Sequence, residues 1–374
     1  MEKKIIAVFL VVLLVVFGIF VLGFSAQWFS NEKLKEDFKV LSLNISVNED
    51  ISTMTKFSFK KVILSMAFYI KLVFILVFNR IGIVYIQVSY PVFAFLKDSI
   101  FVLILKLFRK KVVGAVLGTG YKEIIESKGR LLLKYYGFVF RKFNAFTTPS
   151  TFMLANDGFT WEMLNKSKEL PFAINPINPS MQSIKEVSFP FQILFMGNLH
   201  PGKGVFECLE SISYVVKKYQ RVKFIFAGEW SSREDEVRAN KIIEENDVSS
   251  YCEIIGTISG EEKKKYFEES QIFLLPTYYH SEGLPLALLD ALSFGLYIIT
   301  TKHAAIPSAI IDSFNGVCCK QGDSQDLADK IIIAIKEKAE TDRIRHQAIK
   351  CFYSNYTYSI FINRFKDFLN EFIN

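Results

Sequence analysis

The stretch Gln271–Gly295 decides the fold, and it reads QIFLLPTYYHSEGLPLALLDALSFG. It opens with the apolar run Ile272–Leu275, which is short enough for a buried parallel strand. Pro276 ends this run, because proline has no N–H for the hydrogen-bond ladder. A polar and aromatic loop follows, and Pro285 then suits the first turn of a helix with apolar residues at helical spacing. The pattern predicts a strand–loop–helix unit, with its loop at the edge where open α/β sheets bind ligands.

Two acidic residues mark this unit. Glu282 lies in the loop, and Asp290 follows eight residues later, about two turns into the predicted helix. Both carboxylates can therefore point the same way, and two carboxylates at this spacing can bind the hydroxyls of a sugar and a ribose. The N–H groups of Gly283 and Leu284, at the positive end of the helix, can bind a phosphate or sugar oxygen. A single acid at a helix start would also serve as an ordinary cap.

The stretch resembles the E-x7-E signature of retaining GT-B glycosyltransferases, in particular the large bacterial family 4 type (glycosyl transferases group 1). In that family the first Glu contacts the transferred sugar and the second holds the ribose of the nucleotide. The resemblance gives these roles to Glu282 and Asp290. Because Asp290 is one methylene shorter than the family's Glu, it keeps the charge but has less reach.

A second loop with chemical character follows the predicted strand Phe191–Met196. It reads GNLHPGKG over residues 197–204 and precedes an apolar-periodic helix. As G-x4-G-K it matches a P-loop, with Lys203 on the phosphates. A P-loop needs Ser or Thr next for Mg²⁺, whereas Gly204 stands there. A P-loop ATPase is therefore a remote alternative.

The same loop resembles the G-R-L-x-x-x-K-G turn of GT-B enzymes. Asn198 replaces the usual Arg, and four other positions match: Gly197, Leu199, Lys203 and Gly204. The replacement removes one of the two cations expected on the diphosphate. The resemblance therefore leaves most of the charge neutralisation to Lys203, helped by the dipole of the following helix. An exposed loop lysine is the alternative interpretation.

Composition limits the classes of protein that fit. The chain has 374 residues, which suggests two domains, and 51% of them are hydrophobic, enough for sizeable cores. The net charge of +7 is modest and gives little support for nucleic-acid binding. The five cysteines form no C-x-x-C pair, and the four histidines show no metal-ligand spacing. These patterns predict a reducing compartment and no structural metal.

The N-terminal segment, residues 1–25, has three interpretations. After two lysines, Ile5–Phe24 is almost uninterruptedly apolar and long enough to span a bilayer. It also has the outline of a signal peptide. As a third interpretation, Ile5–Leu10 is the first strand of a Rossmann-like domain, followed by a buried helix. We expect a membrane-associated or buried element that faces the cytosol.

The remaining chain alternates between strand and helix patterns, which indicates parallel sheets covered by helices. The predicted helices include a buried one over residues 60–78, a single one over residues 122–142, and one over residues 259–270 whose start at Ser259 resembles a capping box. Residues 26–186 form the predicted N-terminal domain, whose last strand is expected over residues 170–178. A polar linker places the boundary near Glu186. Residues 187–350 form the predicted nucleotide-sugar-binding domain, and residues 351–374 the closing helices.

The first predicted domain also contains a glycine turn after one of its strands. Gly118, Thr119 and Gly120 follow a strand predicted over residues 111–117, and glycine lets the backbone approach a ligand. In the resembling family a His-Gly often occupies this turn, and the His contacts the reacting sugar. Leu117 stands in the His position, so that support is absent or supplied elsewhere. A plain strand–helix turn explains these glycines equally well.

The predicted fold is α/β, of the GT-B class, with two doubly wound Rossmann-like domains facing across a cleft. The predicted reaction moves a hexose from a UDP- or GDP-sugar to a glycan or lipid-linked acceptor with retention, in cell-surface polysaccharide synthesis. Because Lys203 stabilises the leaving diphosphate, neither a metal nor another cofactor is expected. The predicted catalytic residues are Glu282 and Lys203. The predicted donor-binding residues are Asn198, Lys203, Gly204, Glu282, Gly283, Leu284 and Asp290.

Two further hypotheses belong to other classes. A degenerate, non-catalytic nucleotide-sugar-binding subunit explains Asn198, Asp290 and Leu117 together. A nucleotide-sugar epimerase shares the architecture, but we expect more acid–base groups in its first domain. No residue stands out as a general base, which fits a front-face mechanism of the kind proposed for the resembling family. We expect a cytoplasmic protein, attached to the inner face of the membrane, that binds a nucleotide sugar, its acceptor and a membrane surface, but no nucleic acid.

Overall fold

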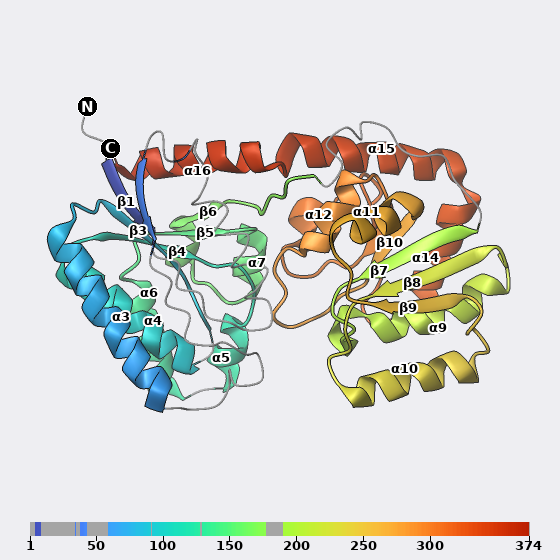
Figure 1. The fold of residues 1–374 in the computed structure, drawn as a ribbon, viewed down its shortest axis with the longest axis horizontal. Coiled ribbons are helices and arrows are strands. Elements are labelled where there is room, and N and C mark those ends of the chain that lie inside the picture. The colour runs from blue at the N-terminus through green and yellow to red at the C-terminus, as the bar shows by residue number, and fades with distance from the viewer. Residues whose placement is uncertain are drawn as a thin grey trace. The chain divides into compact units, whose positions relative to one another are not determined.

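The computed structural model describes residues 4–8, 34, 38–42, 59–90, 92–127, 129–176 and 190–373 (Figure 1). The chain forms two compact units. The first contains Met1–Leu170 and Ile362–Asn374, and the second contains Pro171–Phe361. The chain thus passes between units after Leu170, whereas the boundary expected near Glu186 lies outside the described residues.

The first unit is built on a parallel sheet with the strand order β2-β1-β3-β4-β5-β6. Its strands are β1 (Lys4–Val8), β2 (Phe38–Ser42), β3 (Ile83–Gln87), β4 (Lys111–Ala115), β5 (Ala145–Thr148) and β6 (Ser167–Glu169). Strand β1 lies inside the sheet, where Ile6 is in register with Ile83. The interpretation of the N-terminal segment as a strand therefore agrees with β1, which spans residues 4–8. Residues 9–33 lie outside the described residues.

Helices α3, α4 and α6 cover one face of this sheet, and α16 covers the other (Figure 1). This follows from the right-handed crossovers that carry the chain across the sheet in one direction from β2 to β6. Tyr85 of β3 packs against Phe365 of α16, with ring centroids 5.3 Å apart. The helices are α3 (Phe59–Phe78), α4 (Val92–Leu107), α5 (Tyr121–Ser127), α6 (Arg130–Phe140), α7 (Thr151–Asn156), α8 (Trp161–Asn165) and α16 (Tyr358–Ile373).

Three expectations for the first unit were wrong. The single helix predicted over residues 122–142 is two helices, α5 and α6, with Gly129 at the start of the second. The last strand is β6 and not residues 170–178, because Pro171 cannot donate to a ladder and belongs to the second unit. Helix α3 was expected to be buried, yet one of its faces is exposed to solvent.

The second unit has its own parallel sheet, with the order β12-β11-β10-β7-β8-β9. Its strands are β7 (Phe191–Met196), β8 (Val222–Ala227), β9 (Cys252–Gly256), β10 (Ile272–Leu275), β11 (Tyr297–Thr300) and β12 (Val317–Cys318). The strands predicted over residues 191–196 and 272–275 are confirmed. All four residues of β10 are buried, as its uninterrupted apolar run requires.

Helices pack around this second sheet. They are the short 3-10 helix η2 (Pro201–Lys203), α9 (Val205–Val216), α10 (Arg233–Glu245), α11 (Gly260–Glu269), α12 (Leu286–Ser293), α13 (Ile306–Ala309), α14 (Ser324–Lys336) and α15 (Lys338–Asn355). Pro285 is the N-cap of α12, one position before the helix starts. The capping box expected at Ser259 is wrong, because its side chain caps no amide of α11. The closing helices begin at Lys338, earlier than the predicted residue 351.

Within the described residues, no helix is both long and apolar enough to cross a membrane. The strand order of the second sheet instead identifies its ligand-binding edge. From β7 the chain proceeds to β8 and β9 on one side, and then returns to β10 on the other side of β7. The loops after β7 and β10 therefore diverge at a topological switch point, which is where open α/β sheets bind ligands.

Candidate functional site

The loops after β7 and β10 touch each other through two glycines. Gly204 has a φ of +79°, and a Cβ there would lie 2.6 Å from the carbonyl oxygen of Pro276. Only glycine fits this backbone and this close approach. The carbonyl of Gly202 accepts a hydrogen bond of 2.7 Å from the N–H of Tyr278. The predicted motif G-x-x-x-x-G-K-G thus has a mechanical role, because it lets the two loops meet.

This contact brings the two predicted catalytic residues together. The ammonium Nζ of Lys203 lies 2.6 Å from Oε2 of Glu282. Both side chains are buried, with 6% of Lys203 and 1% of Glu282 exposed. The hydroxyl of Thr277 lies 2.9 Å from the same carboxylate oxygen and donates to it. Lys203 is therefore no exposed loop lysine, and that alternative interpretation is wrong.

The two buried charges of this pair depend on each other, because neither is solvated by bulk water. Removing two charges from water costs several kcal/mol per ion, and the partners recover it only from each other and from their hydrogen bonds. Lys203 also lies 5.2 Å from the centroid of the Tyr279 ring. Burial, and then the charge of Glu282, raise the pKa of the Tyr279 hydroxyl, so this neighbour stays neutral.

Helix α9 begins directly after Lys203. Its N-cap is Gly204, and no side chain caps its first turn. The first N–H groups of a twelve-residue helix, together with its dipole and an adjacent ammonium, form an environment suited to an anion. The arrangement has the parts of a phosphate site: a cation, a positive helix end and a glycine turn.

The other acid of the predicted signature has a different lysine. Asp290 on α12 is 4% exposed, and its Oδ2 lies 2.6 Å from Nζ of Lys263 on α11. Burial raises the pKa of Asp290, and the ammonium of Lys263 opposes that shift. Lys263 was missed, because its helix is separate in sequence from both motifs and a lysine on a polar helix face carries no distinguishing signal.

The remaining predicted donor-binding residues lie in the same loops. Asn198 is exposed, and its carbonyl accepts a hydrogen bond of 2.8 Å from His200 N–H. The carbonyl of Gly283 accepts from Ala305 N–H at 3.3 Å, and Leu284 is 3% exposed. The hydrogen bonds described for these three residues do not join them to the Lys203–Glu282 pair.

One further side chain, that of His200, shapes the site without having been predicted. Nδ1 of His200 accepts a hydrogen bond of 2.9 Å from Gly202 N–H and so caps η2. Its ring lies 4.9 Å from that of Tyr279. Burial lowers the pKa of His200, with the charge of Lys203 adding to the shift and that of Asp235 opposing it. His200 is therefore a neutral acceptor at pH 7, the form that its hydrogen bond requires.

The glycine turn of the first unit is occupied differently. The carboxylate of Asp157 accepts hydrogen bonds of 3.0–3.2 Å from the N–H groups of Gly120, Tyr121 and Lys122. Asp157 is 5% exposed, so it takes the first amides of α5 inside the unit. Leu117 is half-buried beside this turn. The interpretation as a plain strand–helix turn accounts for these contacts.

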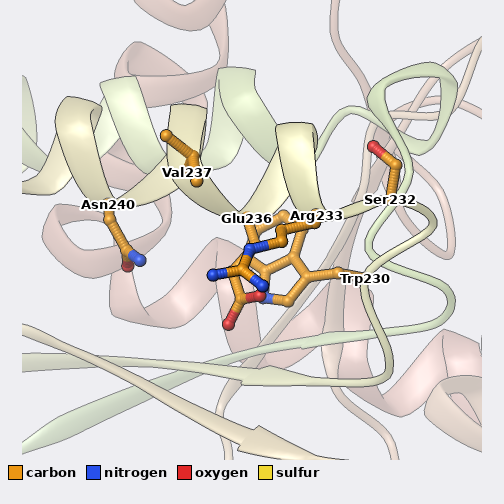
Figure 2. A pocket seen from close by; sticks show the side chains of 6 residues that line it. All are labelled: Trp230, Ser232, Arg233, Glu236, Val237 and Asn240. Atoms are coloured by element: carbon orange, nitrogen blue, oxygen red, sulfur yellow. The ribbon is translucent and has the colours of Figure 1, made fainter.

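A hollow of about 490 Å³ lies beside α10 in the second unit (Figure 2). It is lined by Trp230, Ser232, Arg233, Glu236, Val237 and Asn240. Figure 2 shows these side chains on α10 and on the segment that leads into it. None of the predicted site residues lines this hollow.

Among the described residues, no group of three or more His, Cys, Asp or Glu side chains is arranged to hold a metal ion. The five cysteines are free thiols. Metal independence of the reaction stays a prediction, because it concerns the state with the donor bound.

Residues 178–351 match the family described as "Glycosyl transferases group 1". This region contains both loops, both predicted acids and both lysines. The match lies within the second unit and covers just under half of the chain. The retaining family 4 subtype is a finer assignment, which we treat below as a proposal.

Curated relatives match part of the chain. The amylovoran biosynthesis glycosyltransferase AmsK of Erwinia amylovora is 26% identical over 178 residues, 43% of this chain and 43% of the relative. The capsular polysaccharide biosynthesis glycosyltransferase CapM of Staphylococcus aureus is 22% identical over 186 residues, 49% of this chain and 47% of the relative. The similarity thus spans less than half the length of these relatives.

Solved structures match the chain over its whole length. A glycosyltransferase from Rickettsia africae superposes with a TM-score of 0.77 at 15% identity, covering 100% of both chains. Anabaena HepE in complex with UDP superposes with a TM-score of 0.73 at 12% identity, covering 98% of this chain and 100% of that one. The chain therefore has the GT-B fold, as predicted.

Proposed function

We propose that this protein is a glycosyltransferase that takes its sugar from a nucleotide-diphosphate donor. The buried pair of Lys203 and Glu282 carries the proposal, because it lies at the switch point of the sheet and next to the uncapped start of α9. The names of AmsK and CapM, both glycosyltransferases of polysaccharide biosynthesis, support it. So does the UDP bound to HepE, which has the same fold.

The ion pair suggests how the donor binds. A diphosphate that reaches the start of α9 supplies Lys203 with a second anion, and the ammonium has three donors to share. Glu282 then keeps its hydrogen bond from Thr277 and offers its other lone pairs to sugar hydroxyls. Donor binding thus exchanges one set of partners for another and leaves no charge buried alone.

The same geometry favours departure of the nucleotide. As the bond between the anomeric carbon and the phosphate oxygen breaks, negative charge grows on the diphosphate. Lys203 and the helix dipole of α9 stabilise that charge without needing to reorganise. We assign Lys203 to leaving-group stabilisation and Glu282 to orientation of the sugar. No metal has a required part in this step.

We further propose that the reaction proceeds with retention through a front-face step. The acceptor oxygen forms its bond to the anomeric carbon on the side from which the phosphate leaves. The acceptor's proton passes to the departing phosphate oxygen, so the step needs no protein base. Glu282 is charge-paired with Lys203 and accepts a hydrogen bond from Thr277, which agrees with an orienting role better than with a role as base.

Asp290 is assigned to the ribose of the donor. Its partner Lys263 is 24% exposed, so the carboxylate is held from one side by an ammonium that itself reaches solvent. Ribose hydroxyls would donate to the free lone pairs of this carboxylate. The shorter Asp side chain needs such a fixed partner to hold its position, since it lacks the reach of the usual Glu.

The acceptor is proposed to be a glycan or lipid-linked saccharide and the transferred sugar a hexose, in synthesis of a cell-surface polysaccharide in the cytoplasm. Relatives named for amylovoran and capsular polysaccharide support this class of product. The free cysteines fit a reducing compartment.

Slow donor hydrolysis tests the function without knowledge of the acceptor. The full chain is incubated with UDP-glucose, GDP-glucose and their hexose analogues, and nucleotide release is measured while NMR records the first anomer of free sugar. We expect release from one donor, with the donor's anomer appearing first. Glu282→Gln should abolish release, and the matched change Glu244→Gln on the exposed side of α10 should not. Unchanged release in Glu282→Gln would overturn the proposal.

A further inference from the structure

The first unit exposes an apolar stripe on helix α3. Met66, Ile70, Phe74 and Phe78 recur at helical spacing and are 57–70% exposed. The opposite face of the helix is the buried one, with Leu72 at 0%. Helix α3 therefore turns apolar side chains both toward the sheet and toward solvent, which is unusual for a helix that covers a sheet.

Helices α4 and α6 continue the same pattern. On α4, Phe93, Ile100 and Leu107 are spaced by seven residues and are 78%, 42% and 81% exposed. On α6, Leu131 and Phe138 have the same spacing and are 84% and 41% exposed. Each of the three helices thus directs one apolar row away from the sheet.

The three rows lie on one surface of the unit. Helix α3 contacts α4, and α4 contacts α6, so the helices are neighbours in this order. They lie on the same face of the sheet, opposite α16 (Figure 1). We define the docking face as the outward rows of α3, α4 and α6. Exposed apolar rows on three neighbouring helices indicate an interaction site rather than a scatter of single side chains.

Positive charge is concentrated in the same part of the chain. Residues 59–122, which include α3 and α4, contain ten Lys or Arg and a single acid. That acid, Asp98, is buried, with 4% exposed. Because the whole chain has 45 basic and 38 acidic residues, everything outside residues 59–122 has slightly more acid than base. The net positive charge of the protein therefore belongs to this segment.

Several cations border the docking face. Lys71 on α3 and Lys134 on α6 are exposed beside the apolar rows. Arg80 and Arg109 are exposed just after the ends of α3 and α4, close in sequence to Phe78 and Leu107. The docking face is thus apolar with a cationic border. It is complementary to a ligand surface that has an anionic outer layer over an apolar interior.

We propose that the docking face binds the surface of an anionic lipid bilayer. The aromatic and aliphatic side chains enter the boundary between headgroups and acyl chains, and the lysines and arginines stay at the level of the phosphates. A second copy of the chain is a poorer occupant, since it would bring an equally positive surface. Nucleic acid is also a poorer one, because it has no use for rows of exposed Phe, Ile and Leu.

The docking face lies in the first unit and its proposal is independent of the donor site in the second. If the protein transfers sugar to a lipid-linked acceptor, the bilayer would hold the enzyme and its acceptor in one plane. Binding would be peripheral, in keeping with helices that lie along the sheet and bury one side against it.

Flotation with lipid vesicles tests the proposal on the full chain. Vesicles of phosphatidylcholine alone are compared with vesicles that also contain phosphatidylglycerol, at low and high salt. We expect binding to the anionic vesicles, weakened by salt because exposed charges are screened. Binding to neither kind of vesicle overturns the proposal.

Two variants address the two components of the docking face. Ile70→Ser/Phe74→Ser removes apolar contact, and its matched control is Val237→Ser/Ile311→Ser, at positions that are 61% and 57% exposed in the second unit. Lys71→Glu/Lys134→Glu removes charge, and its control is Lys218→Glu/Lys338→Glu, which are also exposed. Each docking-face variant should lower the partition coefficient at least about tenfold, and each control should leave it unchanged.

Melting and size measurements separate the other occupants. The docking-face variants should have the melting temperature and the oligomeric state of the wild type. A wild-type dimer that Ile70→Ser/Phe74→Ser converts to a monomer assigns the face to a second copy and overturns the proposal. A large fall in the melting temperature of a docking-face variant would mean that the rest of the chain covers the docking face. That result would also overturn the proposal. Should the apolar variant not fold, full vesicle binding by the charge variant overturns the proposal.

Discussion

The two units treat the turn between a strand and a helix in opposite ways. In the first unit the amides at the start of α5 are bound by the buried carboxylate of Asp157. In the second unit no side chain caps α9, and a lysine precedes it. The first turn carries its own anion, whereas the second is the turn to which we propose that the donor diphosphate binds. A glycine turn in a Rossmann-like unit therefore indicates a ligand site only when the protein has not supplied a carboxylate for it.

Among the changes that test this difference, breaking the Lys203–Glu282 pair should have the largest effect on the free energy of unfolding. Lys203→Met leaves Glu282 buried without its counter-ion, which costs about 3–5 kcal/mol of unfolding free energy. The double variant Lys203→Met/Glu282→Gln should recover most of that stability, since neither charge then remains. Denaturant unfolding of the single and double variants checks this. Equal stability of all three proteins would show that the pair is not buried in solution.

The two glycine turns should also respond differently to alanine. Gly204→Ala forces a side chain to a φ of +79° and places its Cβ against the Pro276 carbonyl, so we expect a loss of about 1–3 kcal/mol. Gly120→Ala is strained as well, because its φ is +134°, but the atom nearest to the added Cβ belongs to the Tyr90 ring at 3.5 Å, an ordinary contact. Gly204→Ala should therefore reduce nucleotide binding, and Gly120→Ala should not. Chemical denaturation combined with nucleotide titration measures both effects.

Removing the internal anion of the first unit tests the other half of the comparison. Asp157→Ala should lower the unfolding free energy by about 1–2 kcal/mol, because three amides lose their acceptor. Nucleotide affinity should stay at the wild-type value. A loss of nucleotide affinity at unchanged stability would contradict the assignment of Asp157 as a cap.

The smallest effect concerns Asp290 and depends on pH. Because burial raises its pKa, the folded protein favours the protonated acid. The contribution of Asp290 to stability is therefore fully present below its unfolded pKa of about 4 and declines as pH rises through the higher folded value. Asp290→Asn should be no less stable than wild type at pH 7, with the advantage disappearing in acid. Melting temperatures of the two proteins between pH 4 and about pH 8 show this, and a variant destabilised at neutral pH would contradict it.

The sequence predicted the second unit much better than the first. Short apolar runs ended by Pro276 and by the loop at residue 197 placed β10 and β7 correctly, because buried parallel strands have few alternatives. In the first unit the break between α5 and α6 was missed, since the apolar spacing continues through it. The exposed rows of α3 were taken as buried because periodicity does not say which apolar face meets solvent.

The site shows the same limit. Local motifs identified Lys203 and Glu282, but their ion pair depends on β7 and β10 being neighbours in the sheet, although they lie far apart in sequence. Lys263 and Thr277 have no local signal at all, and only the packing of α11 and of the β10 loop brings them to the two acids. Asp157 likewise reaches its amides from a later part of the chain.

Calorimetric titration of UDP, GDP and ADP into the wild type and the Lys203→Met/Glu282→Gln variant tests the central claim most directly. The double variant keeps the second unit folded while it removes the proposed phosphate cation. We predict that one nucleotide binds the wild type, and that its affinity falls at least about tenfold in the variant. The same dissociation constant in both proteins would contradict the account, because the loops after β7 and β10 would then not hold the donor diphosphate.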